Sequence, residues 1–309
     1  MGTPLLWVAF NLFVLAAVAL DLGVFGKRLH KISLKEAAIS SAAWVAISGL
    51  FGLGILHFSG RQPALEFFTG YLIEKALSVD NLFLFLVIFR TFAIDDRFQH
   101  RMLEWGILGA LVMRAIMIGV GATLIEKFAW LVYALGAFLV YAGAHMLFAK
   151  KEEVHPEKNF LVRFATKHLR VTREYHGERF FTRIGGELFA TPLFLVLMVV
   201  EMTDVTLAVD SIPAIFGITT DPFIVYTSNV FAILGLRAMY FLLAGVLKQL
   251  RFLTVGLSFV LIFIGGKMIA GYWFHVPEFV ALSTVAGILL LALVASLLFP
   301  AKSKAAVLT

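Results

Sequence analysis

Long apolar runs alternate with short polar segments along the whole chain. The runs cover residues 4–25, 38–58, 64–89, 103–125, 129–149, 188–215, 222–247, 252–274 and 277–299. About twenty consecutive apolar residues cross the hydrocarbon core of a bilayer as one α-helix. The pattern predicts an all-α polytopic membrane protein, a single transmembrane domain over residues 1–309 with about nine transmembrane helices.

Composition supports this prediction and narrows the function. Hydrophobic residues make up 61% of the chain and charged residues only 15%, whereas soluble domains carry about 25% charged residues. An ordinary cytosolic enzyme is therefore excluded, and no enzymatic activity is expected. The chain contains no cysteine, which argues against a thiolate metal site or a dithiol redox centre.

Basic residues indicate the orientation. Of the 26 Lys and Arg residues, 20 lie in alternate loops and at the C-terminus, two (Arg61 and Lys127) lie in the opposite loops, and the remaining four lie within apolar runs. Because cytoplasmic loops carry the excess of Lys and Arg, the N-terminus should lie outside and the C-terminus in the cytoplasm. The same distribution explains the net charge of +6 without a nucleic-acid partner.

The longest segment outside the apolar runs, residues 150–187, is predicted to be a cytoplasmic connector. Residues 179–189 resemble a short β-hairpin around Gly185 and Gly186, and an irregular connector is the alternative.

An internal repeat divides the chain. The corresponding segments are 74–81 and 204–211, which share an acid–x5–acid spacing, then 113–115 and 236–238, then 143–146 and 265–268. Three helices in each copy would invert the second copy in the membrane, as in many secondary transporters with a midplane substrate site. The predicted parts are two N-terminal helices (1–62), repeat one (63–149), the connector (150–187), repeat two (188–274), and a last helix with the C-terminal tail (275–309).

Five acidic residues lie within apolar runs, where each costs roughly 2.5–3.5 kcal/mol on insertion scales. They are Glu74, Asp80, Glu201, Asp204 and Asp210, and they are flanked by the oxygen donors Asn81 and Ser211. Carboxylate, amide and hydroxyl oxygens suit hard divalent cations such as Mn²⁺, Mg²⁺ or Ca²⁺. These seven residues are the predicted metal site.

The supporting charges have two interpretations. Structural ion pairing with the acids and a role in gating are both open for Arg114 and Arg237, whereas pairing with Glu74 is favoured for Lys75. Lys267 is a further intramembrane cation. Asp21 is either an acidic residue at the membrane interface or a ligand at the entrance of the ion pathway.

Helical geometry adds a constraint. Glu74 and Asp80 lie about 240° apart around an ideal helix, so they cannot share one face. Either the helix unwinds near the acids or it contributes to two sites. Pro213 favours unwinding in the second repeat.

The sequence resembles the TerC family of integral membrane proteins, most closely its Alx branch. The resemblance is carried by residues 68–75, 78–81, 208–216, 220–225 and 228–241. It implies metal-ion efflux, chiefly Mn²⁺ export, from a bacterial inner membrane, with the five acids above matching the intramembrane acids of the family. The family name comes from tellurium resistance, and Alx-like proteins are also described as redox modulators.

The leading hypothesis is a secondary transporter that exports Mn²⁺ or a similar cation, with protons as a possible counter-ion and no organic cofactor. The chain lacks a phosphate-binding loop, so ATP drive is not expected. The alternative is a membrane metal-supply, redox-modulating or tellurium-resistance protein without transport of its own.

Overall fold

The computed structural model describes most of the chain. The described residues are 2–26, 34–92, 94–128, 130–148, 171–172, 177, 179–184, 186–246, 252–271, 273–274 and 276–299. Most of the predicted connector, residues 150–187, lies outside them.

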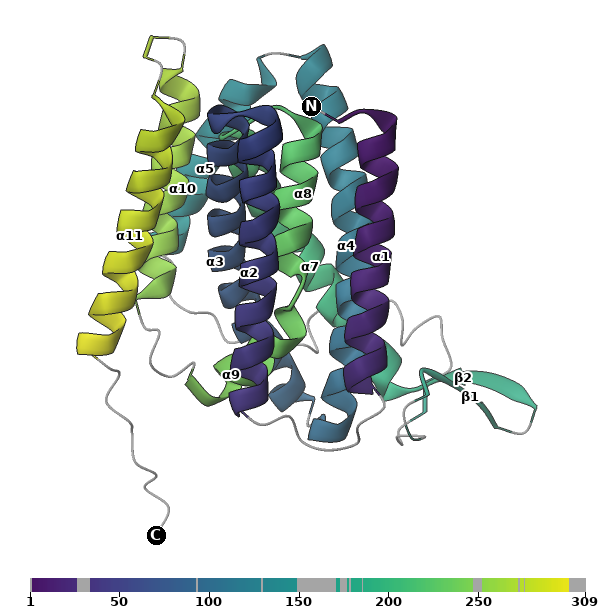
Figure 1. Ribbon diagram of the computed structural model, residues 1–309. Coiled ribbons are helices and arrows are strands. Elements are labelled where there is room, and N and C mark those ends of the chain that lie inside the picture. Colours follow the sequence, from purple (N-terminus) through teal and green to yellow (C-terminus); the bar gives the residue numbers. More distant parts are fainter. Residues whose placement is uncertain are drawn as a thin grey trace.

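Helices dominate the described residues and run roughly parallel or antiparallel to one another (Figure 1). In chain order the elements are α1 (Pro4–Gly26), α2 (Leu34–Ser59), α3 (Arg61–Thr91), α4 (Asp96–Lys127), α5 (Leu131–Phe148), β1 (Phe181–Ile184), β2 (Glu187–Ala190), α7 (Pro192–Phe216), α8 (Pro222–Ile233), α9 (Leu236–Val246), α10 (Leu253–Ala270) and α11 (Glu278–Leu298).

Each predicted apolar run coincides with a helix, and the run 222–247 is divided between α8 and α9, which are bent by 44°. Six helices of the described chain are long and apolar enough to cross a membrane, and the bent pair makes a seventh. α3 is not among them because it carries six charged residues. The protein is therefore a polytopic helical membrane protein, and nine spans stay a prediction.

The hairpin prediction is confirmed. β1 and β2 pair in antiparallel register from Phe181 opposite Ala190 to Ile184 opposite Glu187. Gly186 lies in the turn with a φ of +88°, a conformation that favours glycine. The hairpin projects from one end of the bundle (Figure 1).

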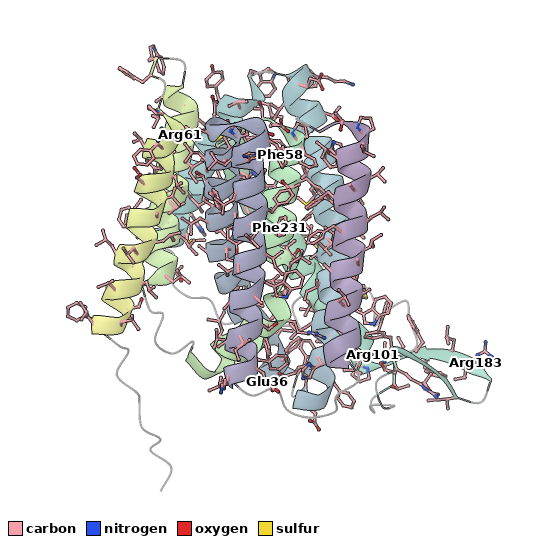
Figure 2. All side chains as sticks on the ribbon, in the orientation of Figure 1. Glu36, Phe58, Arg61, Arg101, Arg183 and Phe231 are labelled. Carbon is pink, nitrogen blue, oxygen red and sulfur yellow. The ribbon has the colours of Figure 1, made fainter. Side chains whose placement is uncertain are left out.

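α8 lies at the centre of the bundle, and all of its residues from Phe223 to Ile233 are buried. Phe231 packs on Phe51 of α2, with 4.7 Å between ring centroids, and on Phe10 of α1, with 5.7 Å (Figure 2). Large apolar side chains point outward from the peripheral helices instead, for example Leu50 of α2 and Leu291 of α11. This arrangement suits a lipid surround.

Three arginines outside the apolar core mark the two ends of the bundle. Arg101 and Arg183 lie at the end that carries the hairpin, and Arg61 lies at the opposite end (Figure 2). α1 begins at the Arg61 end, and α11 finishes at the hairpin end (Figure 1). This placement agrees with the loop assignment on which the predicted orientation depends.

α5 and α10 pack closely through glycines. A Cβ on Gly265 would lie 2.5 Å from the carbonyl oxygen of Gly136, and one on Gly143 would lie 2.7 Å from that of Ser258. Small residues allow helix backbones to approach in membranes, where van der Waals packing drives association.

We predict that Gly265→Ala destabilises the protein by about 1–3 kcal/mol, because the added methyl group forces α5 and α10 apart. The neighbouring Gly266 is the matched control, since a Cβ added there would have no neighbouring atom within 4 Å. Thermal unfolding in detergent measures both variants. Equal melting temperatures for Gly265→Ala and Gly266→Ala would contradict the close packing of this pair.

Candidate functional site

A buried arginine joins four helices. Arg114 of α4 donates from Nη1 to Oε1 of Glu74 on α3, and from Nη2 and Nε to the two carboxylate oxygens of Asp204 on α7, at 3.2 and 3.4 Å. Nη1 also lies 3.3 Å from Oδ1 of Asn229 on α8. We call Arg114, Glu74, Asp204 and Asn229 the arginine cluster.

The cluster is closed to solvent. Arg114 is 1% exposed, Glu74 and Asn229 are fully buried, and Asp204 is 4% exposed. Two carboxylates and one guanidinium leave a formal charge of −1 among these groups. An unbalanced charge in a low-dielectric interior is costly, so the cluster favours an additional cation or a proton.

Several buried polar atoms of the cluster and of its helices have no hydrogen-bond partner among the described residues. They are Oε2 of Glu74 and Nδ2 of Asn229 in the cluster, and Oγ of Ser78 and Oγ of Ser211 elsewhere on α3 and α7. Buried polar atoms are normally satisfied, and oxygens in particular suit hard cations. Asn81 is also buried on α3, consistent with the predicted face shared with Glu74.

Glu201 lies beside this cluster. It stands three residues, about one turn, before Asp204 on α7, and its carboxylate fills the space where a Cβ at Gly109 of α4 would stand. The residue is only half-buried, unlike Glu74 and Asp204.

The predicted unwinding near the acids is wrong. α3 is continuous from Arg61 to Thr91, and α7 is continuous from Pro192 to Phe216 with Pro213 inside it. Glu74 and Asp204 both find their partner, Arg114, on α4, so no carbonyl groups need to be freed next to them. Neighbouring helices commonly make a proline tolerable in a membrane helix.

The break lies instead between α8 and α9, at Leu234 and Gly235. Gly235 has a φ of +82°, which ends the helix at little steric cost. Lys75 of α3 donates from Nζ to the carbonyl oxygens of Ala232 at 3.0 Å and Leu234 at 3.4 Å. Glu74 pairs with Arg114, so the favoured pairing of Lys75 with Glu74 is wrong and Lys75 stabilises the end of a broken helix.

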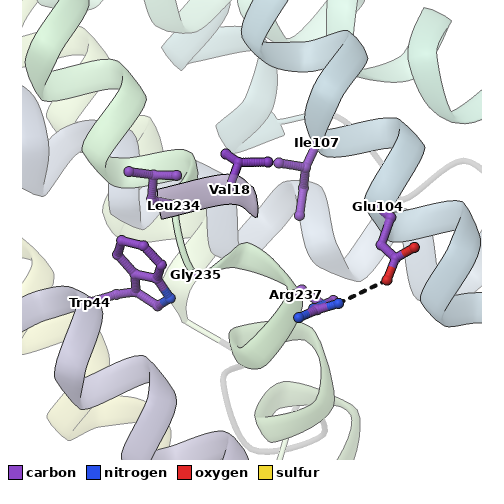
Figure 3. Close-up of a pocket in the computed structure, with 7 residues that line it drawn as sticks. All are labelled: Val18, Trp44, Glu104, Ile107, Leu234, Gly235 and Arg237. Carbon is purple, nitrogen blue, oxygen red and sulfur yellow. Dashed lines mark hydrogen bonds and ion pairs between the residues drawn. The ribbon is translucent and has the colours of Figure 1, made fainter. Parts of the chain in front are cut away.

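Arg237 stands apart from Arg114, although the predicted repeat places them at equivalent positions. Its Nη1 lies 2.9 Å from Oε1 of Glu104 on α4 (Figure 3). The break two residues earlier turns α9 away, which directs Arg237 to a different carboxylate. Sequence analysis missed Glu104, which stands at the edge of an apolar run, and also missed Asn229, a polar residue inside the run 222–247.

The remaining predicted residues are placed only in part. Asp21 lies on α1, Asp80 on α3 and Asp210 on α7, but their side chains lie outside the described part of the structure. Lys267 lies in the last turn of α10. Among the described side chains, no three His, Cys, Asp or Glu residues form a group able to hold a metal ion. The seven-residue metal site therefore stays a prediction, of which the structure brings together Glu74 and Asp204.

Comparison with known proteins identifies the family. The profile of the integral membrane protein TerC family matches residues 59–305. The chain is 48% identical to an uncharacterized membrane protein of Myxococcus xanthus, over 96% of this chain and 93% of the relative. It is also 48% identical to the Escherichia coli K12 protein named "Putative membrane-bound redox modulator Alx", over 94% of each.

A membrane protein of Rickettsia bellii is 38% identical over 94% of this chain and 97% of its own length. No solved structure matches. The match spans all the elements from α3 to α11, including both carboxylates that contact Arg114, and on this basis the chain belongs to the TerC family of integral membrane proteins.

Proposed function

We propose that this protein is a secondary transporter that exports a hard divalent cation, Mn²⁺ or a similar ion, from the cytoplasm of a bacterium across its inner membrane. The observation that carries the proposal is the arginine cluster, in which two buried carboxylates from different helices share one arginine. Intramembrane charges of this kind mark ion pathways more often than they stabilise a fold.

Arg114 and the cation compete for the same carboxylates. Without metal, the guanidinium keeps Glu74 and Asp204 from repelling each other. A divalent ion neutralises both carboxylates fully once the arginine moves away. Glu201, Asp80, Asp210, Asn81 and Ser211 supply further oxygen ligands in this proposal, with Asp21 nearer the membrane surface and Lys267 as a supporting charge.

The packing of the helices supports an inverted repeat. In the predicted repeat, α3 corresponds to α7, α4 to α8 and α5 to α10. The α4–α7 contact then has the α8–α3 contact as its counterpart, and both contacts are present. The α5–α7 and α10–α3 contacts correspond in the same way. Paired helices also run in opposite directions (Figure 1). These features favour a carrier with nine spans and alternating access at the centre.

Export needs a source of free energy. Moving two positive charges outward against an inside-negative potential costs about 4.6 kcal/mol per 100 mV. Exchange of the metal for protons on the same carboxylates lowers this cost, so protons are the proposed counter-ion. No ATP, organic cofactor, enzymatic reaction or nucleic acid enters the proposal.

A second candidate follows from the name of the Alx relatives. In it the protein modulates redox balance, supplies metal or confers tellurium resistance without transport of its own. The 48% identity to Alx favours this candidate, whereas the lack of cysteine argues against intrinsic thiol chemistry. An indirect redox effect through metal supply agrees with both candidates.

Metal flux into proteoliposomes that contain only this chain tests the proposal. We expect Mn²⁺ flux from the wild type, and flux at background for Asp204→Asn, Asp80→Asn and Asp210→Asn, because Asn keeps the shape but not the charge. Glu126→Gln, an exposed acid at the far end of α4, is the control and should retain full flux. A wild-type protein without flux would favour the second candidate.

The competition between arginine and metal predicts an unusual variant. Arg114→Gln removes the partner of two buried carboxylates, which should cost about 3–5 kcal/mol without metal. Mn²⁺ should then bind at least as tightly as to the wild type and raise the melting temperature more, while flux falls because the empty carrier does not reset. Calorimetry, melting curves and flux on one preparation make the comparison. A folded Arg114→Gln protein that fails to bind Mn²⁺ would assign Arg114 to the binding site itself.

Orientation gives a separate prediction. Topology reporters inserted at residue 165 or fused after Thr309 should report the cytoplasm, and a reporter before Met1 should report the outside. The expectation follows from the excess of Lys and Arg in the loops on the hairpin side. An external signal at residue 165 would reverse the direction of transport proposed here.

A further inference from the structure

The hairpin formed by β1 and β2 has no part in the functions argued above, and its surface is both apolar and basic. Leu188 is 60% exposed, Ile184 45% and Phe181 43%. Arg179 and Arg183 are exposed beside them, and neither has an ion pair within the described part of the chain. Exposed apolar side chains mixed with arginines are typical of segments that lie on a membrane surface.

The root of the hairpin lies at the lipid-facing side of α4. Phe180 packs edge-to-face on Trp105, with 5.9 Å between the ring centroids. Trp105 is exposed and belongs to a row of exposed α4 side chains that continues at Val112, Ile116 and Val120. Spacings of seven and four residues place this row on one face of the helix, which in a membrane protein contacts lipid. Because tryptophan is enriched at the membrane–water interface, Trp105 marks the level at which this row reaches the headgroups.

The hairpin is attached firmly to α7. The backbone N–H of Thr191 donates to the carbonyl oxygen of Phe180 at 2.9 Å, and its hydroxyl group donates to that of Arg179 at 2.7 Å. Phe181 packs on Phe194 in the first turn of α7, with 4.6 Å between the ring centroids. The bundle therefore fixes the direction of the hairpin, which projects sideways from one end of the bundle (Figure 1).

The pairing of the two strands sorts the exposed side chains onto two faces. Paired residues of antiparallel strands lie on the same face, and the faces alternate along each strand. Phe181 and Arg183 therefore share one face with Leu188, whereas Ile184 and Glu187 lie on the other. The first face is apolar and basic, and the second carries an acid. Phe181 contacts the first turn of α7, so the apolar and basic face is the one turned toward the bilayer.

We propose that the face formed by Phe181, Arg183 and Leu188 is a docking surface for anionic phospholipid headgroups beside the bundle. Leu188 enters the boundary between headgroups and acyl chains, and the guanidinium of Arg183, which lies far out along the hairpin (Figure 2), binds lipid phosphate. On the predicted orientation this is the cytoplasmic leaflet, whose anionic lipids create a negative surface potential. The inference does not depend on transport of any ion.

Charge favours lipid over a second copy of the chain as the occupant of this face. A symmetric contact between two copies would bring the Arg183 side chains of both hairpins to one interface. Like charges across an interface repel, whereas a phosphate group complements the guanidinium.

Site-directed fluorescence tests which face contacts lipid. The chain has no cysteine, so Leu188→Cys and the matched control Ile184→Cys each give one labelling site, on opposite faces of the same hairpin. The full chain is labelled with NBD in nanodiscs of phosphatidylcholine and phosphatidylglycerol. We expect the probe at residue 188 to be quenched by nitroxide-labelled lipid and protected from aqueous iodide, and the probe at residue 184 to show the reverse. Val112→Cys, in the lipid-facing row of α4, is the reference for a lipid-exposed probe.

Two outcomes of this experiment would overturn the inference. Equal access of iodide to residues 184 and 188 would place the whole hairpin in water. Protection of residue 188 from both quenchers would show that protein, either a second copy or another partner, covers this face.

Lipid selectivity tests the role of Arg183. Quenching at residue 188 by nitroxide-labelled phosphatidylglycerol, relative to nitroxide-labelled phosphatidylcholine at the same mole fraction, measures the preference of the hairpin for the anionic lipid. Arg183→Gln should lower this preference roughly fivefold, the factor that corresponds to about 1 kcal/mol per arginine near an anionic surface. Arg183→Lys should largely retain it, and Glu187→Gln on the other face is the control that should not lower it. An unchanged preference in Arg183→Gln would overturn the assignment of this face to anionic lipid.

Discussion

A charged side chain buried among membrane helices needs an oppositely charged partner in direct contact with it. In this protein that constraint is clearest at Arg114. Its guanidinium contacts groups from α3, α7 and α8 and is itself carried by α4, so one side chain fixes the mutual rotation of four helices. Breaking a buried ion pair typically costs about 3–5 kcal/mol, which exceeds the contribution of most single apolar contacts. The central helix α8, with every residue from Phe223 to Ile233 buried, joins this network through Asn229 in addition to its aromatic contacts.

The two predicted repeats neutralise their buried arginines differently. In the first, α4 is continuous and its arginine reaches the central carboxylates. In the second, the equivalent helix is broken at Gly235, and its arginine serves a carboxylate nearer the hairpin end. A break releases carbonyl groups that water cannot satisfy at this depth, and Lys75 satisfies two of them. Adjacent residues of α3, Glu74 and Lys75, thereby connect the arginine cluster to the break between α8 and α9.

Much of the fold follows from the sequence because apolar runs and turn residues act locally. The positions of the helices and the hairpin around Gly186 were predictable for this reason. Which buried charged groups pair with each other was not predictable, because it depends on how each helix is rotated against its neighbours. The sequence marks Arg114 and Arg237 as equivalent, yet only the structure pairs them with different acids. The break was expected near Pro213, whose missing N–H the helix tolerates, and it lies at Gly235, where a positive φ ends α8.

A buried arginine also offers a way for a carrier to limit its affinity for the transported ion. Two carboxylates in a low-dielectric site would bind a divalent ion with great affinity and release it slowly. When a guanidinium takes the place of the leaving ion, the carboxylates are never left without a cationic partner. The free energy needed to release the ion is then lower by the free energy of the guanidinium–carboxylate interaction. Arginine suits this part because it stays charged and contacts both oxygens of one carboxylate, as Arg114 does with Asp204. In the proposed carrier, the same interaction that holds the four helices together would therefore also set the affinity of the site for its ion.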